Sequence, residues 1–139
     1  MIKFLDLCYV SKICFLFQIG HVTADLGVIP LASELVGTID STVFLVCSSS
    51  AKPILCLWKT PYGHVYTLSE GVFAESGRLR HKANASSDEC GLEIVGLQHK
   101  DEGRWECEIG SLIEDTFQTA TAKINLQVKR KLLESWKKI

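Results

Sequence analysis

The chain lacks an excess of charge of either sign. Its 139 residues carry 15 lysines and arginines against 16 aspartates and glutamates, for a formal net charge of −1. This balance excludes a protein that binds nucleic acid through a basic surface, since such a surface needs many cations to neutralise phosphates. The hydrophobic fraction of 47% excludes a disordered chain, because that much apolar surface can offset backbone entropy when buried. The length suits one domain and a leader.

Motifs for catalysis and for phosphate or metal binding are also missing. The chain contains no GxGxxG segment and no phosphate-binding loop of the GxxxxGKS or GxxxxGKT type. The serines at residues 48–50 are not part of a GxSxG elbow. The cysteines have neither CxxC spacing nor nearby histidines. The sequence therefore predicts no enzyme, no metal site and no cofactor.

A long apolar run is absent too, although the amino terminus is apolar. Residues 1–24 carry Lys3 and Lys12 ahead of an apolar stretch at 13–19 and end at Ala24, which is typical of a signal peptide. The stretch is too short to span a membrane. We expect cleavage after Ala24 and a secreted chain. The alternative is that this segment forms a buried first strand or helix of the domain.

Cysteine, in contrast, is plentiful, with 6 residues. Removal of residues 1–24 would leave four of them, an even number in a chain sent to an oxidising compartment, and two disulfides are expected. The four are Cys47, Cys56, Cys90 and Cys107. The sequon Asn84-Ala85-Ser86 fits the same route and predicts glycosylation of Asn84.

From Val28 onward, short segments of alternating polarity are separated by glycine, serine, aspartate and proline, which predicts an all-β fold. Side chains alternate between the two faces of a strand, and this alternation puts the cysteines on the inward side. The predicted inward residues also include Ile54, Trp58, Leu92, Ile94, Trp105, Ala122, Ile124, Leu126 and Val128.

Several of these residues together resemble the immunoglobulin superfamily. They are Cys47, Trp58, the Leu92-Glu93-Ile94 segment and the DxGxWxC motif from Asp101 to Cys107. The resemblance covers roughly residues 28–128 and implies a two-sheet antiparallel Greek-key sandwich of variable-like or intermediate type, in a domain at 25–128. It implies a Cys47–Cys107 bridge packed against Trp58. In such a topology Cys56 and Cys90 lie at one end of the sandwich, so these two form the second expected bridge.

Two further features of the family map onto this chain. Arg78 and Asp101 match a salt bridge of the family, and the alternative is that they are two unrelated solvated charges. The family usually has tyrosine two residues before the second cysteine, where this chain has Trp105. Because an indole donates only through its ring nitrogen, we expect Trp105 to act mainly in the core.

The outer face of the predicted sheet combines charges with two leucines. Leu55 and Leu57 point outward, and the charged or polar residues on the same face are Lys59, Arg104, Glu106, Glu108, Thr121 and Lys123. Protein interfaces bury an apolar centre within a polar rim, so Leu55 and Leu57 are the binding candidates. Alternatively, a strand or loop covers them, or they are merely exposed. Loops expected at residues 48–53 and 110–117 are a second candidate surface.

Residues 129–139 are expected to form a basic amphipathic tail that contacts an anionic membrane, continues into a further domain or remains a frayed end. The resemblance implies a secreted module for cell adhesion or cell-surface recognition, whose protein partner is a receptor or a second copy. Two alternatives stay open. One is a humoral immune effector that binds microbial or anionic surfaces, and the other is a structural spacer from a longer receptor.

Peptide mapping without reduction tests the predicted sandwich. We expect peptides that link Cys47 to Cys107 and Cys56 to Cys90. Links from Cys47 to Cys56 and from Cys90 to Cys107 would contradict the prediction, because such bridges would not follow the immunoglobulin pattern.

Overall fold

The computed structural model describes residues 25–67, 73–82 and 88–131. The predicted signal peptide, Asn84 of the sequon and the predicted tail beyond Lys131 lie outside these ranges. Within them the chain consists of strands, turns and one short 3-10 helix, η1 (His99–Asp101), which confirms the predicted all-β fold class. No helix in this part of the chain is long and apolar enough to cross a membrane.

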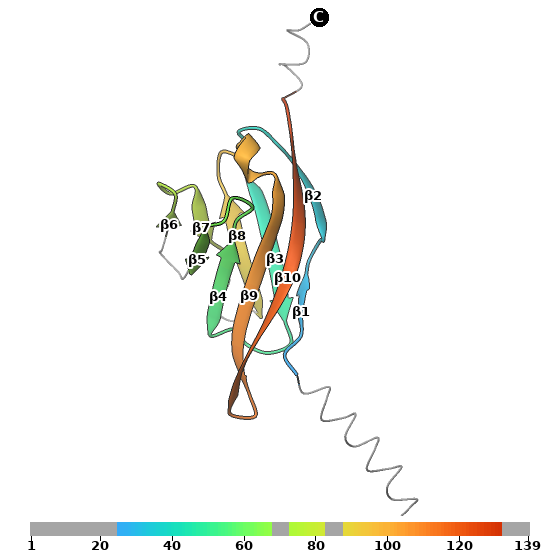
Figure 1. Cartoon of the computed structure of the whole chain (residues 1–139), viewed down its shortest axis with the longest axis vertical. Coiled ribbons are helices and arrows are strands. Elements are labelled where there is room, and N and C mark those ends of the chain that lie inside the picture. The colour runs from blue at the N-terminus through green and yellow to red at the C-terminus, as the bar shows by residue number, and fades with distance from the viewer. Residues whose placement is uncertain (1–24, 68–72, 83–87, 132–139) are drawn as a thin grey trace, which may run out of the picture.

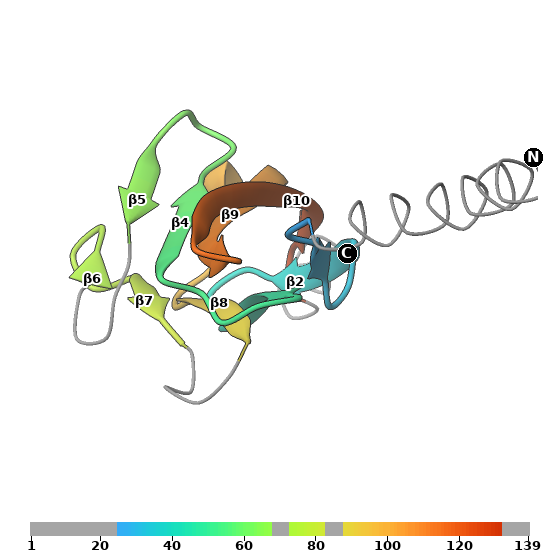
Figure 2. The same cartoon turned by 90° about the horizontal axis from the view of Figure 1, so that it is seen from below.

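The strands form two facing sheets (Figures 1 and 2). The back sheet runs in the order β1 (Val28–Pro30), β3 (Val43–Ser49), β8 (Glu89–Ile94), β7 (Leu79–His81) and β6 (Phe73–Ala74). The front sheet runs in the order β2 (Glu34–Thr38), β10 (Thr116–Lys129), β9 (Gly103–Ile113), β4 (Leu55–Lys59) and β5 (Val65–Thr67). Neighbouring strands in these sheets are antiparallel, except that β2 pairs in parallel with β10.

The alternation in the sequence separates the inner and outer faces of each sheet. On β10, every second residue from Ala122 to Val128 is buried and the residues between them are exposed. Trp58, Leu92, Ile94 and Trp105 have no solvent-exposed surface and fill the space between the sheets. Full burial of a large apolar side chain contributes about 1.5–3 kcal/mol, so these residues carry much of the packing energy.

Two disulfides cross the core. Cys47 on β3 is joined to Cys107 on β9, with Cα atoms 6.7 Å apart. Cys56 on β4 is joined to Cys90 on β8, with Cα atoms 5.9 Å apart. The two bridges are neighbours, because Cys47 and Cys90 are opposite each other in the β3–β8 ladder. Trp58 is opposite Cys107 in the β4–β9 ladder, which places its indole beside the first bridge.

Two expectations at strand ends are wrong. Residues 110–117, expected to be a loop, are mostly strand: β9 and β10 continue as a long hairpin that turns at Glu114 and Asp115 and projects beyond the sandwich (Figure 1). Lys129, the first residue of the predicted tail, is the last residue of β10. Ile54, expected to face inward, is 60% exposed, because it precedes β4 at the open end of the core.

Trp105 is fully buried in the core, and it also makes a hydrogen bond there. Its Nε1–H donates a hydrogen bond of 2.8 Å to the backbone carbonyl oxygen of Asp101. The indole therefore ties β9 to the η1 turn. The resemblance assigns this kind of contact to a tyrosine hydroxyl, and a buried indole nitrogen likewise needs an acceptor.

The hairpin turn carries backbone strain that a substitution can relieve. Glu114 and Asp115 both have positive φ, 49° and 63°, in the two-residue connection between β9 and β10. Glycine adopts this conformation without a Cβ clash and is favoured in such turns. We expect Asp115→Gly to raise the free energy of unfolding by about 0.5–1 kcal/mol, measured by urea denaturation. Thr119→Gly, inside β10, is the control and should lower it by a similar amount. If both variants lose stability, the backbone at Asp115 is not strained.

Candidate interaction face

The outer surface of the front sheet, here called the front face, consists of the outward side chains of β5, β4, β9, β10 and β2. Its residues fall into rows, because paired strands are in register. From the hairpin end the rows are Leu112 with Phe117; Leu55 with Gly110 and Thr119; Thr67 with Leu57, Glu108 and Thr121; Val65 with Lys59, Glu106 and Lys123; and Arg104 with Asn125 and Glu34. The face is therefore apolar near the hairpin and charged at its other end.

Both sequence-predicted binding candidates lie in the apolar half. Leu55 and Leu57 are half-buried on the outer side of β4. Cys56, between them, points inward to its bridge with Cys90. β5 pairs with β4 within the sheet, so Thr67 lies beside Leu57 and does not cover it.

A third large apolar side chain joins these leucines. Phe117 is 51% exposed, and its ring lies over Gly110. A Cβ on Gly110 would be 2.6 Å from Phe117 Cζ and 3.1 Å from Leu55 Cβ. Only glycine leaves room for this contact, so Gly110 brings Phe117 from β10 towards Leu55 on β4. Leu112, which is 55% exposed, completes the apolar end of the face.

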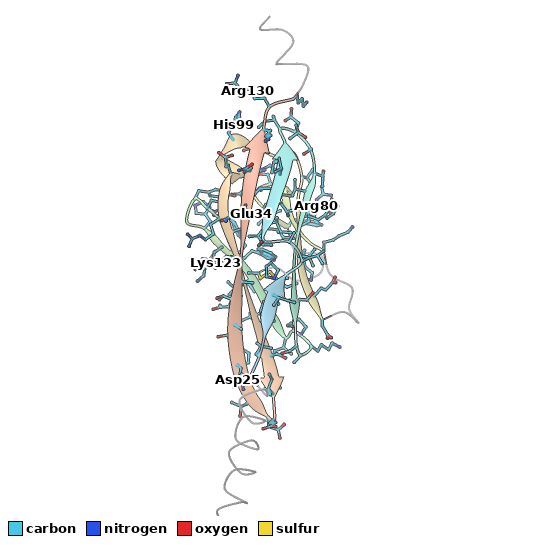
Figure 3. The ribbon with its side chains drawn as sticks, turned by 90° about the vertical axis from the view of Figure 1, so that its right-hand side faces the viewer. Asp25, Glu34, Arg80, His99, Lys123 and Arg130 are labelled. Atoms are coloured by element: carbon cyan, nitrogen blue, oxygen red, sulfur yellow. A yellow bond between two sulfur atoms is a disulfide. The ribbon has the colours of Figure 1, made fainter. Side chains whose placement is uncertain are left out.

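The charged end of the face is partly paired within the sheet. Lys123 Nζ lies 3.8 Å from Glu106 Oε1, and Asn125 Nδ2 donates to Glu34 Oε1 at 3.0 Å. Figure 3 shows the sandwich from its edge, with Lys123 on the front sheet and Arg80 on the back sheet. Polar groups of this kind are typical of the rim of a protein interface.

A polar cluster centred on Glu75 holds the β4–β5 hairpin against the β6–β7 turn. Glu75 Oε2 accepts hydrogen bonds from Tyr62 Oη at 2.8 Å and from the Arg78 guanidinium at 2.9 Å, and Oε1 accepts one from Tyr66 Oη at 3.2 Å. Lys100 Nζ lies 3.6 Å from the same carboxylate. Because Tyr66 belongs to β5, the cluster helps to keep this edge strand in the front sheet.

Arg78 and Asp101 form a two-pronged ion pair. The Arg78 guanidinium donates to the two carboxylate oxygens of Asp101 at 3.0 and 3.1 Å, and the Asp101 side chain is fully buried. Asp101 also accepts the backbone N–H of Gln98 at 2.8 Å. Arg78 and Asp101 are therefore paired, and the alternative of two unrelated solvated charges does not apply. The hydrogen bonds that Arg78 donates to Asp101 raise the pKa of Arg78.

The cluster shifts the acid–base properties of its members. Burial opposes ionisation of Glu75, but hydrogen bonds from Tyr62 and Arg78, the charge of Lys100 and a hydrogen bond from Tyr66 outweigh it and lower the pKa of this carboxyl group. Burial, together with the neighbouring Glu75 carboxylate, raises the pKa of Tyr62 and of Tyr66. Glu75 therefore remains ionised and both phenols remain protonated at neutral pH.

Sequence reasoning missed the role of Gly110 and that of Glu75. A glycine inside a strand indicates close approach of another group, and this signal was available for Gly110. Glu75 gives no such signal, because its partners come from separate turns and strands.

Comparisons with known proteins identify the fold through structure. No family model and no curated protein sequence matches this chain. The first immunoglobulin domain of Dpr1, solved bound to the first domain of DIP-eta, superposes with a TM-score of 0.58 at 20% identity, covering 71% of this chain and 91% of that chain. The domain has the immunoglobulin fold.

Two further immunoglobulin domains show the same similarity. The first domain of mouse SynCAM 2 has a TM-score of 0.56 and 20% identity, covering 74% of this chain and 97% of that chain. The first domain of ZIG-8, solved as a homodimer, has a TM-score of 0.58 and 17% identity, covering 72% of this chain and 81% of that chain. These matches cover 81–97% of the length of the three solved immunoglobulin domains.

The Glu75 cluster predicts a pH dependence of stability. The pKa of Glu75 in the folded chain is lowered from the ordinary value of 4.5. At pH values just below 4.5 the unfolded chain therefore binds more protons than the folded chain. The stabilisation is complete above that value and is lost as pH falls through the folded-state pKa. We expect Glu75→Gln to cost about 2 kcal/mol at neutral pH and to flatten the acid limb of the stability curve, measured by urea denaturation across pH.

Glu114→Gln, at the exposed hairpin turn, is the matched control for loss of one carboxylate and should keep the wild-type acid limb. An acid limb that is the same in Glu75→Gln and in the wild type would show that Glu75 does not carry the effect.

Proposed function

We propose that this immunoglobulin domain is an extracellular recognition module that binds another protein through its front face. The observation that carries the proposal is the apolar end of that face, where Leu55, Leu112 and Phe117 gather around Gly110. Aromatic and aliphatic side chains surrounded by polar groups are the usual composition of a protein interface.

The rigidity of the sheet supports the same role. The two disulfides join β4 and β9 of the front sheet to strands of the back sheet. Binding through this sheet therefore costs little conformational entropy of the backbone. The structurally similar Dpr1 domain was solved bound to another immunoglobulin domain, and the ZIG-8 domain as a homodimer. These complexes support a protein partner for this chain as well.

Secretion and a role in adhesion or cell-surface recognition are part of the proposal. Disulfides persist in oxidising compartments, and two of them in a small domain favour the extracellular space. Cleavage after Ala24, glycosylation of Asn84 and a tail that binds anionic surfaces remain predictions from the sequence.

An interaction screen with substitutions on both faces tests the proposal. The full chain, expressed in secreting cells, is assayed against itself and against a panel of cell-surface ectodomains. For each binder found, we expect Leu57→Asp to weaken binding by about a hundredfold, because a charge would be buried in the apolar part of the interface.

Phe44→Asp is the matched control, since Phe44 is 50% exposed on the back sheet opposite Glu93. Thermal unfolding of both variants checks that each is folded. Binding that depends on Phe44 and tolerates Leu57→Asp would move the interface away from the front face.

A further inference from the structure

Glu108 occupies the centre of the front face. Its strand, β9, is the middle strand of the front sheet. Its row is the third of the five rows, between the apolar row of Leu55 and the charged row of Lys59. The direct neighbours of Glu108 are Leu57 on β4 and Thr121 on β10, neither of which carries a charge.

Glu108 differs from the other carboxylates of the face in having no partner among the described residues. Glu106 is paired with Lys123, and Glu34 accepts a hydrogen bond from Asn125. Water solvates an unpaired carboxylate at a half-buried position such as 108. Any protein that covers the face removes this water, and the loss is unfavourable unless the covering surface supplies a cation or hydrogen-bond donors.

A second copy of the chain that pairs about the centre of the front face does not place a cation opposite Glu108. In a two-fold symmetric pair, a residue on the axis faces its own copy, so a pairing centred on the front face sets Glu108 against Glu108. If the strands of the two copies run in the same direction, each row meets itself and Lys59 meets Lys123. If they run in opposite directions, the row of Leu55 meets the row of Lys59. Either arrangement is mismatched in charge or in polarity.

We propose that the front face binds a different protein, one that presents an apolar patch to Leu55 and Phe117 and a lysine or arginine to Glu108. This inference rests on the proposed function and extends it to the chemistry of the partner. Glu108 then has two effects on specificity: it opposes self-pairing, and it selects partners with a basic residue at the matching position.

Sedimentation equilibrium of the full chain tests the first effect. We expect the wild type to be monomeric and Glu108→Leu to self-associate at least about tenfold more strongly, because the substitution joins position 108 to Leu55 and Leu57 as one apolar surface. Glu106→Leu is the matched control and should stay monomeric, since Lys59 and Lys123 remain beside it. A wild-type dimer that Leu57→Asp dissociates would overturn the inference, and so would a monomeric Glu108→Leu variant.

Binding to the ectodomains found in the screen tests the second effect. We expect Glu108→Lys to weaken binding by about a hundredfold. Glu93→Lys, the same charge reversal on the back sheet, should have little effect. Exchange of the partner's basic residue for glutamate should restore binding to Glu108→Lys. The wild-type complex should also weaken with added salt.

The outcomes separate this inference from the proposed function. Binding that is lost in Leu57→Asp but unchanged in Glu108→Lys would overturn the role of Glu108 and keep the front face as the interface. A homodimer formed through the front face would do the same. Binding that tolerates Leu57→Asp would remove the proposed function itself.

Discussion

Two covalent links between the sheets determine where the outer side chains of the front face lie. Each inward cysteine of the front sheet has outward neighbours along its strand: Cys56 separates Leu55 from Leu57, and Cys107 separates Glu106 from Glu108. Because a strand alternates its side chains with a period of two, a residue that is tied inward directs the next residue outward. A slip of one residue in β4 or β9 would bury the face and expose the sulfurs.

The two ends of the domain are stabilised by different interactions. At the end remote from the hairpin, the partly buried Arg78–Asp101 pair, the Glu75 carboxylate and the Trp105 indole join the β4–β5 hairpin, the β6–β7 turn and η1. Towards the hairpin, β9 and β10 pair with each other beyond the rest of the sandwich (Figure 1). The hairpin can therefore carry Phe117 and Leu112 without support from the back sheet, since Gly110 lets the phenylalanine ring lie against its own sheet.

In the proposed interface, one surface combines attraction with selectivity. Apolar side chains near the hairpin provide area that is released from water on binding, and they do so for any apolar partner. The unpaired Glu108 beside them makes that binding conditional, because its desolvation is compensated only by a partner that supplies a cation or hydrogen-bond donors. Specificity then depends as much on the pairings that the face disfavours as on those that it favours.

The sequence by itself determined the all-β class, the inward position of the four cysteines and of Trp58, and the outward position of Leu55 and Leu57. These features are local, since they follow from alternation along single strands and from the Cys, Trp and DxGxWxC spacing. Only the tertiary structure decided that residues 110–117 form a hairpin, because Glu114 and Asp115 turn the chain without the glycine that usually marks such a turn. It also decided the contact of Phe117 with Gly110 and Leu55 and the partners of Glu75, which join side chains from different strands and turns. Such contacts depend on how the strands are placed beside one another, and no periodicity within a single strand carries that information.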